Sequence, residues 1–165
     1  MNIKKILFLT HAALIAALYV VLTMIANAMG LANYAIQIRF SEALTILPFF
    51  TPAAVPGLFA GCLLSNFLTG CAIPDIIFGS MATLLGAVGT LYLRKSKWLA
   101  PIPPIAANTI IIPFILAYVY QSEGSLPYFM LTVGIGEIIS SGILGILLLN
   151  ILQKYAPGIF RMDIY

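Results

Sequence analysis

The chain has 165 residues, of which 62% are hydrophobic and only 8% are charged, and its net charge is +3. A soluble domain carries about 25% charged residues, so eight basic and five acidic side chains are too few to keep this chain dissolved. The composition excludes a soluble globular domain and predicts an integral membrane protein whose outer surface faces lipid.

The first hydrophobic segment runs from about Ile6 to Ala28 and follows the basic pair Lys4 and Lys5. It resembles a secretory signal peptide, because Ala26-Asn27-Ala28 looks like a cleavage site. The apolar core of a signal peptide has about 7–15 residues, whereas this run is long enough to span a bilayer. We therefore expect a retained transmembrane helix.

Five further hydrophobic segments follow, with boundaries defined to within about 2–4 residues. They lie within Ile36–Phe50, Ala53–Gly70, Ile76–Leu93, Ile105–Tyr120 and Tyr128–Leu152. Prolines at positions 48, 52 and 56 crowd the junction between the first two of these segments. A proline removes a backbone donor and bends or ends a helix, so residues 36–70 form either two helices or one broken helix.

The basic residues decide between six helices and five. With a cytoplasmic N-terminus, six crossings place seven of the eight basic residues in the cytoplasm, as the positive-inside rule expects. Five crossings would place the cluster of Arg94, Lys95 and Lys97 outside, against that rule. We therefore predict an all-α integral membrane protein with six transmembrane helices, a single transmembrane domain over residues 1–165, and cytoplasmic N- and C-termini.

Small residues recur at four-residue spacing in the predicted helices, and such rows let helices approach closely in lipid. The rows include Gly57-Gly61-Ser65, Gly79-Thr83-Ala87, and the glycines 134, 142 and 145. We expect most of them to pack within the molecule. The alanines of the first helix, Ala12, Ala13, Ala16 and Ala17, lie near the chain terminus and form a face that a partner could cover.

Several kinds of chemistry lack the residues that they need. His11 is the single histidine, and Cys62 and Cys71 are the only cysteines, so no cluster has metal-ligand spacing. The sequence contains no phosphate-binding loop and no nucleophile elbow. The basic residues lie at helix ends and do not form the continuous basic face that nucleic acid requires. We expect no enzymatic activity, no metal, no cofactor and no nucleic-acid binding.

Glu137 is the clearest candidate for function. A carboxylate in the middle of a membrane costs about 2.5–3.5 kcal/mol, so its presence there calls for a reason. It lies about nine residues into the last segment, where Gly134 and Gly136 are expected to leave open space beside it. Asn108 lies at a similar depth and could bond to Glu137 or to a shared ligand. The alternative is a structural glutamate that is protonated or hydrogen-bonded.

Other polar residues gather on the predicted outer side, namely Arg39, Glu42, Asp75 and Asn66. Arg39 and Glu42 can form a salt bridge if one helix covers both, and Ser41-Glu42 can cap that helix. Asp75 can cap the helix that follows Pro74. Glu123 is expected to be exposed in an outer loop. These groups predict either helix-end roles or a pocket for a small polar solute.

A series of motifs along almost the whole chain resembles the QueT family. They are Arg39–Thr45 with Leu47-Pro48, Val55–Leu58, Gly61-Cys62 with Asn66, Asp75 with Phe78–Ser80 and Ala82–Leu85, Pro101 with Pro103-Pro104 and Asn108, and Gly136-Glu137. The resemblance implies the six-helix fold of a substrate-binding (S) component of an energy-coupling factor (ECF) transporter in the bacterial plasma membrane. It implies uptake of a queuosine precursor, a 7-deazaguanine base such as preQ1 or queuine.

The resemblance also implies partners, namely a membrane coupling protein, docked on Ala12, Ala13, Ala16 and Ala17, and two cytoplasmic ATPases. The pairing edge of a guanine-like base presents adjacent N–H donors, which a carboxylate such as Glu137 can accept in parallel. Asn108 would read the neighbouring carbonyl or ring nitrogen, and Glu42 or Asp75 would pair with a cationic aminomethyl group. The alternatives are an S component for another vitamin-like solute, a structural membrane subunit without ligand, and a small self-sufficient transporter.

Overall fold

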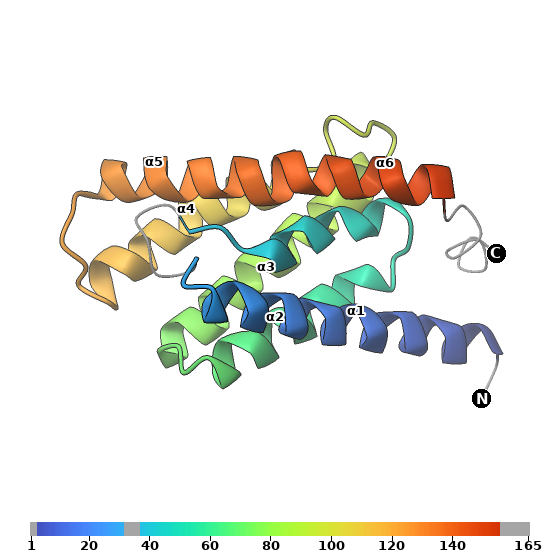
Figure 1. Ribbon diagram of the computed structural model, residues 1–165, viewed down its shortest axis with the longest axis horizontal. Helices are drawn as coiled ribbons and strands as arrows, with labels where there is room; N and C mark the ends of the chain where they lie inside the picture. The colour runs from blue at the N-terminus through green and yellow to red at the C-terminus, as the bar shows by residue number, and fades with distance from the viewer. Residues whose placement is uncertain (1–2, 32–36, 156–165) are drawn as a thin grey trace.

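The computed structural model describes residues 3–31 and 37–155, and every described regular element is helical (Figure 1). Arg161, part of the predicted cytoplasmic cluster, and Ile36, the predicted start of the second segment, lie outside the described residues. The helices are α1 (Ile3–Ala28), η1 (Phe40–Phe49), α2 (Ala54–Leu68), α3 (Ile73–Leu93), α4 (Ile102–Tyr118) and a last continuous helix that runs through α5 (Leu126–Glu137), η2 (Ile138–Leu144) and α6 (Gly145–Tyr155). The prediction of six helices is confirmed.

Three of these helices are long and apolar enough to cross a membrane, namely α1, α3 and the last helix over Leu126–Tyr155. The other three, η1, α2 and α4, are apolar but shorter. The break between η1 and α2 falls at residues 50–53, within the predicted proline-rich junction. Residues 37–70 therefore contain two helices, as the distribution of basic residues predicted.

The short helix η1 is the central element of the bundle. It is a 3₁₀ helix that contacts α1, α2, α3, η2 and α6, and Figure 1 shows it between α1 and the last helix. Seven of its ten residues are buried. Because other helices surround it, η1 can carry polar side chains such as Ser41, Glu42 and Thr45 without exposing them to lipid.

Small residues bring the helices close together within the molecule. A Cβ added to Gly57 would lie 2.7 Å from the carbonyl oxygen of Ala12, and one added to Gly61 would lie 3.0 Å from that of Ala16. In the α3–α4 pair, a Cβ on Gly86 would lie 2.6 Å from the Cα of Pro104. The expectation that most small-residue rows pack internally is confirmed at these contacts.

The packing of α1 divides its alanine face. Ala12 and Ala16 contact α2 and are partly buried, whereas Ala13 and Ala17 are exposed. The expectation that all four alanines form one free face is therefore wrong for Ala12 and Ala16, because the glycines of α2 need a flat neighbour there. The face that remains open consists of Ala13 and Ala17.

The two ends of the described bundle lie together. Figure 1 shows the first turn of α1 and the last turn of α6 at the same end of the molecule. Arg94, Lys95 and Lys97, in the loop between α3 and α4, are exposed, as is Lys154 in the last turn of α6. This arrangement is consistent with an even number of crossings, whereas the side of the membrane on which the termini lie stays a prediction.

Candidate functional site

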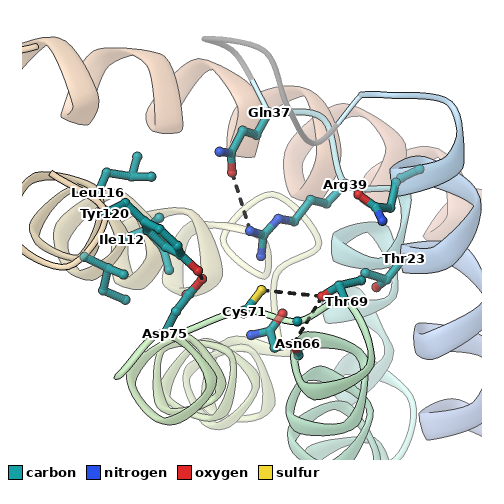
Figure 2. A pocket seen from close by; sticks show the side chains of 14 residues that line it. Thr23, Gln37, Arg39, Asn66, Thr69, Cys71, Asp75, Ile112, Leu116 and Tyr120 are labelled. Carbon is teal, nitrogen blue, oxygen red and sulfur yellow. Dashed lines mark hydrogen bonds between the residues drawn. The ribbon is translucent and has the colours of Figure 1, made fainter. Parts of the chain in front are cut away.

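A cavity of about 390 Å³ lies between α1, α2, α3, α4 and the segment that leads into η1. Figure 2 shows polar side chains from several of these elements turned toward one space. Three residues predicted from the sequence line the cavity, namely Arg39, Asn66 and Asp75. Gln37, Thr23 and Tyr120 line it as well, and Ile112, Ile115 and Leu116 form an apolar wall.

The guanidinium of Arg39 occupies the middle of this space (Figure 2). It donates a long hydrogen bond of 3.4 Å to Oε1 of Gln37. The carboxyl groups of Glu42 and Asp75 interact electrostatically with this guanidinium, and arginine stays protonated in proteins. Arg39 therefore places a permanent positive charge at the cavity, and within the described residues one of its five N–H donors makes a hydrogen bond.

Asp75 lies on the wall opposite, in the first turn of α3, and is 5% exposed. Its Oδ2 accepts a hydrogen bond of 2.8 Å from the Tyr120 hydroxyl, whose oxygen accepts one of 3.1 Å from the backbone N–H of Ala72. Burial, together with the carboxylate of Asp75, raises the pKa of Tyr120, which keeps this phenol a neutral donor.

The role of Asp75 as a helix cap, one of the two predicted for it, is not what the structure shows. The N-cap position of α3 is Ala72, and no side chain caps the helix. Asp75 instead faces the cavity from within the first turn, where the positive end of the helix dipole favours a carboxylate. Similarly, Ser41 and Glu42 do not cap η1, whose N-cap residue is Arg39.

Asn66, near the end of α2, is only 3% exposed and faces the same cavity. Its Nδ2 makes a weak contact of 3.7 Å with the Sγ of Cys62. A Cβ added to Gly79 would lie 3.1 Å from Oδ1 of Asp75 and 3.3 Å from Nδ2 of Asn66. The missing side chain of Gly79 thus leaves room for these two polar groups to lie side by side.

A second polar cluster lies next to the cavity and centres on Asn108. Its Nδ2 donates to Oε1 of Glu137 at 3.0 Å and, more weakly, to Oε2 of Glu42 at 3.5 Å. The predicted contact between Asn108 and Glu137 is confirmed. The second oxygen of Glu137 accepts a hydrogen bond of 3.0 Å from the Ser141 hydroxyl.

Glu42 is 2% exposed and does not line the main cavity. Its Oε1 accepts a hydrogen bond from the Tyr19 hydroxyl, so α1, η1 and α4 meet at this carboxylate. The predicted salt bridge between Arg39 and Glu42 required one helix to cover both residues. The helix η1 begins at Phe40, so it covers Glu42 but not Arg39.

The space expected beside Glu137 is largely filled. A Cβ on Gly136 would collide with the backbone carbonyl of Gln37, and Gly134 faces Thr109. What remains is a pocket of about 20 Å³, room for one water, lined by Gln37, Arg39, Asn108 and Glu137 with two apolar residues. Because Gln37, Arg39 and Ile112 line both spaces, these three side chains lie between Glu137 and the main cavity.

The sequence reasoning missed several partners of the predicted residues, namely Tyr19, Gln37, Tyr120, Ser140 and Ser141. Ser140 accepts a hydrogen bond of 3.2 Å from the backbone N–H of Arg39, so the last helix also positions that residue. Both serines lie in the π segment η2, which starts directly after Glu137. Such π segments are frequent at functional sites. The polar pair Ser140-Ser141 in an apolar helix was a visible signal.

Comparison with known proteins adds independent information. The model of a family described as QueT transporter matches residues 9–154. A curated protein of Lactococcus lactis subsp. cremoris (strain MG1363), named queuosine precursor transporter QueT, is 36% identical over 86 residues. That match covers 52% of this chain and 50% of the relative, so the chain spans about half the length of the curated relative. No solved structure matches the chain.

Proposed function

Because the chain belongs to the QueT transporter family, we propose that it is the substrate-binding S component of an ECF importer. Its solute would be a queuosine precursor, a 7-deazaguanine base such as preQ1 or queuine, as the name of the curated relative suggests. The family is one of transporters rather than enzymes. ATP hydrolysis would take place in two cytoplasmic partner subunits. The protein would lie in the bacterial plasma membrane.

The observation that carries this proposal is the polar cavity among apolar helices. Its volume of about 390 Å³ is near the lower end of the range for small-molecule sites, which suits a compact heterocycle. Its wall combines an apolar side with a few polar groups, the composition that fixes the orientation of a small solute. A flat base would lie against Ile112, with the acceptor atoms of its ring toward Arg39 and its substituent toward Asn66 and Asp75.

Glu137 and Asn108 are proposed to read the pairing edge of the base. Each oxygen of Glu137 accepts one hydrogen bond in the unliganded protein, so further lone pairs remain for two N–H donors of the solute. To reach them, the base would replace the long hydrogen bond between Gln37 and Arg39. Glu42, which accepts a longer hydrogen bond from the same Nδ2 of Asn108, would help to hold this amide in place.

The coupling protein is proposed to dock on the exposed part of the alanine face of α1. Replacing Ala13 and Ala17 together by Trp is expected to abolish co-purification with the ECF module, because two large side chains would prevent close helix contact. Solute binding should stay within about threefold of wild type, since both residues face away from the cavity. The measurement is affinity purification of the complex, with Leu147→Trp, on the exposed side of α6, as control. Normal assembly of the double variant would refute this docking face.

The solute itself can be identified by mass spectrometry of small molecules that co-purify with the protein from bacterial cells. We expect a 7-deazaguanine, and its direct binding to the purified protein should be detectable by calorimetry. Another metabolite in its place would indicate an S component for a different solute. Absence of any bound compound, with no binding of deazaguanines, would favour a structural subunit. Uptake that continues without ATPase partners would indicate a self-sufficient transporter.

A further inference from the structure

Three carboxylates lie around one guanidinium in and beside the cavity. Among the described residues, the carboxylates of Asp75, Glu42 and Glu137 all interact electrostatically with one guanidinium, that of Arg39. Of the three carboxylates, Asp75 is the one that lines the main cavity together with Arg39. Buried charges are costly unless they are paired, and a cationic group of a solute would give Asp75 a second partner besides Arg39.

Asp75 is the carboxylate that a cationic group of a solute in the main cavity can reach. Glu42 does not line the cavity, and the side pocket beside Glu137 holds about one water. Asp75 lines the main cavity, and the hydrogen bond from Tyr120 reaches its Oδ2. An ionised carboxylate has about four acceptor positions, so several remain open toward the cavity.

Asn66 provides a second, independent sign of a ligand at this place. The side chain is only 3% exposed, lies beside Oδ1 of Asp75, and is turned toward the cavity (Figure 2). Within the part of the chain that the structure describes, its amide makes one weak contact, to the Cys62 sulfur at 3.7 Å. A buried amide normally has good hydrogen-bond partners, so a solute group is expected to supply them.

We propose that Asp75, Asn66 and Tyr120 form an ammonium subsite, which makes the protein selective for deazaguanines that carry a protonated exocyclic amine. A primary alkylamine such as that of lysine is protonated at pH 7, and a compact ammonium presents three donors. Asp75 would accept one through its open oxygen positions, and the carbonyl of Asn66 would accept another. Tyr120 holds Asp75 in place and does not itself contact the amine.

This inference rests on the proposed function, because it assumes a deazaguanine ring in the cavity. It assigns the cation to Asp75 rather than to Glu42, a choice that the sequence left open. Arg39, in the middle of the cavity, would repel the ammonium, so the amine must lie on the Asp75 side and the acceptor atoms of the ring on the Arg39 side. The orientation of the base in the cavity follows from these two charges.

The test compares two ligands that share the ring and differ in charge at one position. They are 7-aminomethyl-7-deazaguanine, which is a cation, and 7-cyano-7-deazaguanine, which is neutral. Calorimetry on the purified protein should show that wild type prefers the aminomethyl compound. In Asp75→Asn, affinity for that compound should fall by about 10- to 100-fold, the effect of losing a charged hydrogen bond, while affinity for the cyano compound stays within about threefold. Glu123→Gln removes the same charge from an exposed loop and should change neither affinity.

Equal weakening of both ligands, or no weakening of either, would overturn the ammonium subsite. If wild-type protein binds neither compound, the proposed function itself fails, which is a different result. Gly79→Ala is a second variant in case Asp75→Asn is not stable. Its methyl group would lie 3.1 Å from Oδ1 of Asp75 and should selectively weaken the aminomethyl compound. Gly145→Ala, whose Cβ would make ordinary contacts of 3.6 and 3.7 Å, is the matched control.

Discussion

Replacement of Glu137 by Gln is expected to lower the affinity for any deazaguanine at least a hundredfold while the protein stays folded. Two charge-assisted hydrogen bonds to the pairing edge would be lost, and each contributes about 1.5–3 kcal/mol. A loss of about 1.4 kcal/mol already corresponds to a factor of ten in affinity. The measurement is calorimetry with the aminomethyl and cyano compounds, both of which should weaken, in contrast to the selective effect of Asp75→Asn.

The fold should tolerate this change because the neighbours of Glu137 can adapt. The carbonyl oxygen of a glutamine can still accept from Asn108, and the Ser141 hydroxyl can reverse its role and accept from the amide. Thermal unfolding of the variant should therefore resemble that of wild type. Glu123→Gln, in the exposed outer loop, is again the control. Near wild-type binding by Glu137→Gln would show that Glu137 is a structural residue.

The double substitution Gly57→Ala/Gly61→Ala is expected to separate α1 from α2. The new methyl groups would lie 2.7 Å from the Ala12 carbonyl oxygen and 2.7 Å from the Cβ of Tyr19, distances that require α1 to move. Overpacking of a tight contact costs about 1–3 kcal/mol per site, so the free energy of unfolding should fall by about 2–6 kcal/mol. Thermal unfolding in detergent or nanodiscs measures this effect.

The same double variant should also bind solute more weakly. Tyr19 lies beside Gly61 and donates to Glu42, which in turn accepts from Asn108, so displacement of α1 disturbs the cluster around Glu137. Gly142→Ala/Gly145→Ala provides a matched control in the last helix, where each added methyl would make ordinary contacts of 3.6 Å or more. An unchanged unfolding temperature for the α2 variant would mean that α1 does not pack closely on α2.

Some hydrogen-bond partners of the buried carboxylates were predictable from the sequence, and others were not. The pair Asn108 and Glu137 was predictable because both are polar residues at similar depth in apolar helices, where each needs a partner. The pair Asp75 and Tyr120 was not predictable. Tyr120 follows the end of α4, where no helical periodicity fixes the direction of its side chain, and its hydroxyl reaches Asp75 on α3. Likewise, nothing in the spacing of the residues indicated that Tyr19 bonds to Glu42.

The sequence by itself determined the environment of the chain and the positions of its helices. Partition between lipid and water depends on the composition of each segment, so hydrophobic runs and basic clusters located six helices to within a few residues. Only the tertiary structure decided that η1 lies inside the bundle, that Ala12 and Ala16 are used against α2, and that Asp75, rather than Glu42, faces the cavity. These features depend on how far each helix is rotated and how closely it packs, which contacts between distant segments determine.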